Sequence, residues 1–149
     1  MLPHLLLVAH LLAAAPPAAG VPACRGTLSG AVTGSFACTV SLASGSEGTV
    51  VLAIDGLAPI EGVPSYVPGA FQIAEPVRAG AYTIETLGLG RASVAAKDGT
   101  LYTAAKTSGR RGEVTLVLTS VKKASGGRGR YLVHGTYHAR LVPVGAGKA

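Results

Sequence analysis

Two cysteines, Cys24 and Cys38, are the residues of this chain whose pairing would be simplest to predict. A small even number of cysteines in a chain outside the reducing cytosol is usually bridged. On one straight strand their Cα atoms would lie about 46 Å apart, at roughly 3.3 Å per residue. A disulfide needs them within about 7 Å. We favour the Cys24–Cys38 disulfide, and it requires either that the chain turns back near Ala31 or that this first segment is sharply bent, which Gly30 and Gly34 would permit.

His134 and His138 have the spacing of a zinc-binding pair on a helix. The residues around them, YLVHGTYHARLV, alternate as a strand does, so the two histidines share one face about 13 Å apart. That separation is too long for one zinc ion with bonds near 2 Å. We interpret them as part of the polar face of a strand, and we expect no metal and no cofactor.

Basic residues gather in two segments that flank the strand expected at 113–121. Such a strand would span about 30 Å, so the two clusters would lie at opposite ends of a sheet. Arg91 would join the first cluster and Lys97 the second. They are candidates to bind a polyanion such as surface polysaccharide or lipid headgroups. No aromatic platform accompanies them, so no specific nucleic-acid partner is expected. The candidate residues are Lys106, Arg110, Arg111, Lys122, Lys123, Arg128 and Arg130.

No motif for a catalytic nucleophile, phosphate loop, metalloprotease or dinucleotide is present, and we therefore assign no catalytic residue. The prediction leans away from an enzyme. The alternative from another class is an envelope hydrolase that acts on glycan or peptide through a carboxylate pair about 5–10 Å apart. Its acids would come from Glu47, Asp55, Glu61, Glu75, Glu85, Asp98 and Glu113.

The first 23 residues have the composition of a secretory signal peptide. An apolar run from Leu5 to Ala15 is followed by prolines and small residues. The run is too short to cross a bilayer, which takes about 20 residues, and no later stretch reaches that length. We expect export to the periplasm, the outer-membrane surface or the medium. A hydrophobic amino-terminal strand is the other interpretation of this run.

The end of this leader opens an alternative for Cys24. Val21 and Ala23 are acceptable before the lipidated cysteine of a bacterial lipoprotein, and Pro22 is a poor match. A lipid at Cys24 would anchor the protein to a membrane and leave Cys38 unpaired. In a third case neither chemistry applies.

From residue 24 on, the chain has the pattern of strands throughout, with no helical period. Apolar and small polar residues alternate from Thr27 to Leu42, as one bent strand or two strands with a tight turn. Lys97-Asp98-Gly99 predicts a hairpin turn, and three prolines predict a loop over 58–69. Further strands are expected at 49–57, 70–74, 81–87, 91–96, 100–105, 113–121 and 131–142.

These eight or nine strands indicate one all-β domain over residues 24–149, with a short flexible tail at its carboxyl end. Short connections favour antiparallel neighbours. We predict an antiparallel β-sandwich first and a small β-barrel second.

The arrangement of strand and turn segments resembles uncharacterised exported β-sandwich proteins of Gram-negative bacteria, some of them lipoproteins. The segments are Gly-Ala-Tyr-Thr (80–83), Gly-Glu-Val-Thr-Leu (112–116), Thr-Ser-Val (119–121) and His-Gly-Thr (134–136). The resemblance covers most of the chain after the leader and implies the fold and an exported location, but no activity. The function we expect is a non-enzymatic binding or structural module of the cell envelope, with an unknown partner.

Overall fold

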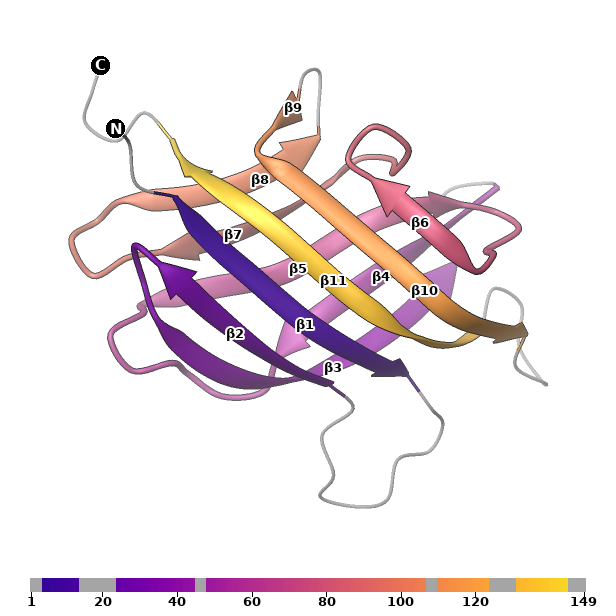
Figure 1. Ribbon diagram of the computed structural model, residues 1–149, viewed down its shortest axis with the longest axis horizontal. Helices are drawn as coiled ribbons and strands as arrows, with labels where there is room; N and C mark the ends of the chain where they lie inside the picture. Colours follow the sequence, from indigo (N-terminus) through magenta and orange to yellow (C-terminus); the bar gives the residue numbers. More distant parts are fainter. Residues whose placement is uncertain (1–3, 14–23, 45–47, 107–109, 124–130, 145–149) are drawn as a thin grey trace.

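The computed structural model describes residues 4–13, 24–44, 48–106, 110–123 and 131–144, and no helix occurs among them. They form one sheet of eleven antiparallel strands (Figure 1). The strands are β1 Leu5–Ala13, β2 Cys24–Gly30, β3 Gly34–Ser44, β4 Thr49–Gly56, β5 Ser65–Ala74, β6 Gly80–Thr83, β7 Gly90–Ala95, β8 Leu101–Lys106, β9 Arg110–Arg111, β10 Glu113–Lys123 and β11 Tyr131–Pro143.

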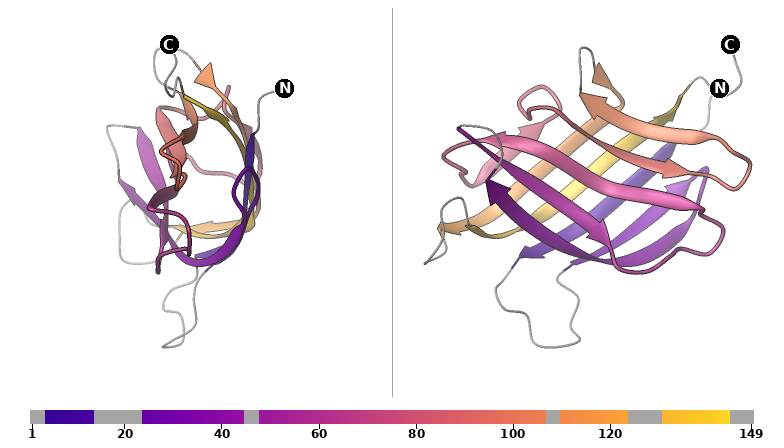
Figure 2. Two further views of the ribbon diagram at one scale, coloured as in Figure 1. Left: turned by 90° about the vertical axis from the view of Figure 1, so that its left-hand side faces the viewer. Right: turned by 180° about the vertical axis from the view of Figure 1, so that it is seen from behind.

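The sheet closes into a barrel at β11. One edge of β11 pairs with β1 over Val133–Leu141. Its other edge pairs with β10 as far as Arg140 and then with β8 at Val142 and Pro143. The closed circuit therefore runs β11, β1, β2, β3, β4, β5, β7, β8 and back to β11, while β6, β9 and β10 are additional. Figure 2 shows the sheet curving round to enclose the interior.

The predicted all-β class is confirmed, and the architecture is the small barrel that we placed second rather than the sandwich. Alternating strands build either fold, because both have one buried face and one polar face. The pairing of β8 with the last residues of β11 makes this sheet a barrel.

Period-2 alternation decides which side chains fill the interior. In β4 the buried residues Val50, Leu52 and Ile54 alternate with partly exposed neighbours. The same rule places Val114, Leu116 and Leu118 of β10 inside. The predicted turn at Asp98-Gly99 is confirmed: Gly99 has a φ of +92°, and the Asp98 carboxylate accepts a hydrogen bond from the Thr100 amide at 2.9 Å.

The predicted loop over 58–69 is wrong from Ser65 onward, because β5 begins there and continues through Pro68. Proline within a sheet occurs at edges and bulges. The pairing of β5 with β7 shifts register between Val67 and Ala70, so the proline lies where the ladder is already interrupted. The strand expected over 81–87 ends earlier, because the amides of Thr86 and Leu87 bond back to the Thr83 carbonyl in a turn.

Residues 5–13, the apolar part of the predicted leader, form β1 between β2 and β11. Leu5, Leu7 and Ala9 are fully buried. In the structure this segment is therefore a hydrophobic amino-terminal strand, which was the alternative interpretation. Removal of residues 1–23 during export stays a prediction. The expected carboxyl-terminal tail, 145–149, lies outside the described residues.

Candidate functional site

The barrel interior is filled with apolar side chains. Tyr137 and Phe71 lie at its centre with ring centroids 6.5 Å apart, and both are at most 1% exposed. Leucine, isoleucine and valine residues from every strand of the circuit except β8 pack around them, and β8 contributes Tyr102 and Ala104. A ligand would therefore meet this protein on its outer surface.

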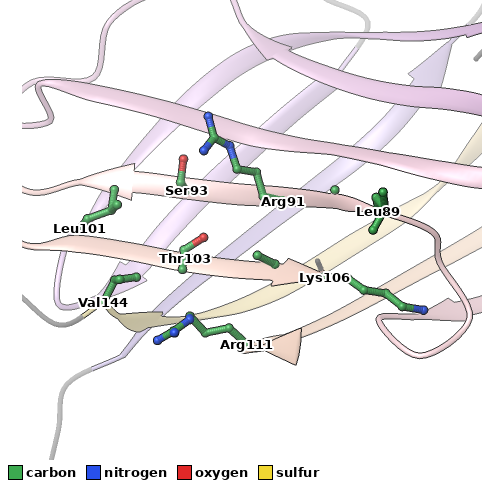
Figure 3. Close-up of a pocket in the computed structure, with 10 residues that line it drawn as sticks. Leu89, Arg91, Ser93, Leu101, Thr103, Lys106, Arg111 and Val144 are labelled. Carbon is green, nitrogen blue, oxygen red and sulfur yellow. The ribbon is translucent and has the colours of Figure 1, made fainter. Parts of the chain in front are cut away.

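A shallow apolar groove lies on the outer face of β7, β8 and β9, with a volume of about 680 Å³. In Figure 3, Leu101 and Val144 lie toward one end and Leu89 toward the other. Leu89 is 55% exposed and Leu101 41%, and among the described residues Leu57 is the one other large hydrophobic side chain exposed to that extent. Exposed apolar side chains gathered in one depression are typical of a binding surface.

Two arginines flank this groove. Arg91 of β7 and Arg111 of β9 both pair in register with Ala105 of β8, one on each side of it. Figure 3 shows them on opposite sides of the groove, with Thr103 between them and Ser93 beside Arg91 on β7. Neither guanidinium group has an ion-pair or hydrogen-bond partner among the described residues. Their guanidinium groups are available to an anion, which an arginine binds through paired N–H donors.

Lys106 borders the same groove but already has partners. Its ammonium group donates hydrogen bonds to the carbonyl oxygens of Leu87 at 2.6 Å and Glu85 at 2.8 Å. These bonds fasten the β6–β7 connection that carries Leu89. Lys106 therefore stabilises the β6–β7 connection at one side of the groove.

The floor of the groove carries two hydroxyl groups. Thr103 faces outward yet is only 8% exposed, and its hydroxyl donates to the Ala92 carbonyl at 3.0 Å. Ser93 lies beside it on β7. A bound anion would accept hydrogen bonds from the arginines and from Ser93, while Thr103 is committed to the sheet.

Of the other predicted basic residues, Arg110 lies beside Arg111 in β9, and Lys122 and Lys123 end β10. Arg128 and Arg130 lie outside the described residues. Arg91 joins the first cluster as predicted. The placement of Lys97 with the second cluster is wrong, because the β7–β8 turn and the end of β10 lie at opposite ends of the molecule (Figure 1). The error arises because β8 pairs with the end of β11 and not with β10.

The two cysteines form the predicted disulfide. The chain turns between Gly30 and Gly34, so β2 pairs with β3 and Cys24 lies directly opposite Cys38, with Cα atoms 4.9 Å apart. A lipid-modified Cys24 could not form this bond, so lipidation at Cys24 is an alternative to the arrangement described here. The disulfide is consistent with an oxidising, exported compartment.

Three of the described carboxylates make structural contacts. Glu113 forms an ion pair with Arg140 at 2.8 Å across β10 and β11. Glu75 accepts a hydrogen bond from the Tyr131 hydroxyl at 3.0 Å. The Thr100 amide lowers the pKa of Asp98, which is the opposite of what a general acid needs. Glu47 lies outside the described residues.

His134 and His138 lie on the exposed face of β11, a strand as predicted. Within the described ranges, no three histidine, cysteine or acidic side chains gather as metal ligands do. The same part of the chain contains no helix long and apolar enough to span a membrane.

No protein family, curated protein or solved structure compared with the chain matches it. The resemblance to exported β-sandwich proteins therefore stays a prediction.

Proposed function

We propose that this protein is an exported, non-enzymatic binding module whose ligand is an anionic amphiphile, meaning an alkyl chain that ends in a phosphate or carboxylate. The observation that carries the proposal is the apolar groove between Arg91 and Arg111, two cations without a described partner. The disulfide and the predicted leader support an exported location.

The groove suits both parts of such a ligand. Leu89, Leu101 and Val144 offer apolar surface to the alkyl chain. Covering that surface contributes roughly 25 cal/mol for each Å² removed from water. Arg91 and Arg111 would hold the anionic group, and the net charge of +6 would attract it from a distance.

Calorimetric titration with dodecyl phosphate, kept below its micelle concentration, tests this proposal. We expect one ligand per chain. Inorganic phosphate, which lacks the chain, and dodecyl maltoside, which lacks the charge, should each bind at least about tenfold more weakly, a difference of about 1.4 kcal/mol. Binding should also weaken with added salt, because exposed charges are screened.

Substitutions separate this groove from the wider set of basic residues. Arg91→Gln with Arg111→Gln should weaken binding at least about tenfold, since a hydrogen bond to a charged group contributes roughly 1.5–3 kcal/mol before solvent screening. Leu101→Ser should weaken it too. The matched control is Lys122→Gln with Lys123→Gln, which also removes two positive charges, at the far end of β10. If this control weakens binding as much as the arginine changes, the ligand is held by diffuse charge and the polyanion alternative is favoured.

A further inference from the structure

Strand β1 lies within the predicted leader, residues 1–23, whose cleavage during export the sequence predicts. It pairs with β2 over seven residue positions and with β11 over nine. It also places Leu5, Leu7 and Ala9 in the core, each at 0% exposure. The same residues are the apolar part of the predicted leader.

The predicted cleavage before Cys24 coincides with an element boundary. Cys24 is the first residue of β2, so a cut there removes β1 entire and leaves β2 and β11 complete. The two edges that held β1 would then face each other across a gap one strand wide, with unpaired amide and carbonyl groups on both sides. Such edges pair readily with an added strand.

The disulfide lies where an open edge would need support. Without β1, strand β2 keeps β3 as its neighbour, over five residue pairs. Cys24 and Cys38 are the first of these pairs, so a covalent bond fixes the end of β2 at which the predicted cut would fall. The edge beside the gap is thereby held in place.

The strand register also indicates which side chains fit in the gap between β2 and β11. Leu5 and Leu7 point inward beside Leu141 and Ala139 of β11. Ala9 lies between Tyr137 and Gly26, and the Phe36 ring occupies the space where a side chain of residue 26 would begin. The gap therefore takes two large aliphatic side chains and then a small one at alternate positions.

We propose that the gap between β2 and β11 is a strand-acceptor site, which binds an extended segment of a partner protein once Leu5–Ala13 is removed. The segment runs antiparallel to both edges and offers the large, large, small pattern of β1. Binding completes the barrel, and the partner is linked to this protein through the core.

The test uses the full chain with a protease site introduced among residues 14–23, which the structure does not describe. The disulfide-bonded protein is cut and mixed with excess labelled peptide of residues 4–13, HLLLVAHLLA, extended by lysines for solubility. Native mass spectrometry then counts the peptide on each chain. We expect one labelled peptide per cut chain and none on the uncut chain, whose gap is occupied.

Two peptide variants supply the matched control. Leu7→Asp places a charge in the core, whereas Leu6→Asp places the same charge on the outer face, where Leu6 is 39% exposed. We expect Leu7→Asp to bind at least about tenfold more weakly than the parent peptide and Leu6→Asp to bind within about threefold of it. Equal loss by both variants would overturn the proposal. So would a cut chain that has lost its own β1 segment and stays folded without taking peptide, or one that aggregates whether or not peptide is present.

Discussion

At the scale of single residues, Tyr137 is notable because it places a polar hydroxyl group in an apolar core. Its ring packs against Phe71, but its hydroxyl oxygen is fully buried and has no hydrogen-bond partner among the described residues. A buried hydroxyl without a partner loses its bonds to water and gains nothing in return. Burial also raises the pKa of this phenol, because an ionised oxygen would be still less stable there.

We expect Tyr137→Phe to raise the free energy of unfolding by about 1–2 kcal/mol, measured by urea denaturation at pH 7. Tyr82→Phe is the matched control. The Tyr82 hydroxyl accepts from the Arg78 amide at 3.0 Å and donates to the Arg78 carbonyl at 2.7 Å, so its loss should destabilise by about 1 kcal/mol. A destabilising Tyr137→Phe would mean that the hydroxyl has a partner after all.

The same residue predicts a dependence on pH. Above pH about 10, the unfolded chain releases the Tyr137 proton while the native chain keeps it, so the parent protein should lose up to about 1.4 kcal/mol of stability per pH unit from this group. Below pH 10 the group contributes no such loss. The difference in stability between Tyr137→Phe and the parent should therefore widen as pH rises above 10, which isolates this tyrosine from Tyr66 and Tyr131.

At the scale of elements, the hairpin of β2 and β3 shows what the alternation of apolar and polar residues can predict. Alternation over 27–42 predicted one bent strand or two strands, a Cys24–Cys38 bond required a turn near Ala31 or a sharp bend, and the structure has two strands joined by a turn. Pattern failed at β5, because a bulge accommodates Pro68 and bulges depend on the neighbouring strand. It was also ambiguous for residues 5–13, since a leader and a buried strand are equally apolar.

We expect the double change Cys24→Ser and Cys38→Ser to lower the free energy of unfolding by about 3 kcal/mol, since the bond closes a loop across a sequence separation of 14. Urea denaturation with and without dithiothreitol measures it. Reduction should destabilise the parent protein by a similar amount and leave the double variant unchanged. A parent protein indifferent to reduction would contradict a stabilising bridge.

The candidate site could be predicted only in part, because it depends on which strands become neighbours. The cluster with Lys106 and Arg111 was visible in the sequence, and Arg91 was assigned to it. That both arginines flank Ala105 follows from pairings of β8 with β7 and β9. Leu89, Leu101 and Val144 carry no signal of their own, because an exposed leucine or valine is common on any surface.

At the scale of the whole molecule, the amino-terminal segment has two interpretations. It is the predicted leader, and it is also strand β1, which lies between β2 and β11 in the barrel. We expect the protein isolated from its native envelope to lack residues 1–23, and the intact mass would establish this. A lipid-free mass that gains two alkyl groups only after reduction would agree with the Cys24–Cys38 bond. Acyl chains on Cys24 would contradict it, and a mass that includes residues 5–13 would mean that β1 is retained.

The barrel closes through a narrow contact, and the groove lies over it. Val142 and Pro143 pair with Thr103 and Tyr102, and the Val144 amide donates to the Leu101 carbonyl at 2.8 Å. Thr103, Leu101 and Val144 also line the groove. Local opening of the β8–β11 pairing and ligand binding in the groove are therefore thermodynamically linked. A ligand that contacts these residues stabilises the closed barrel. Opening of the pairing separates the residues that would bind the ligand.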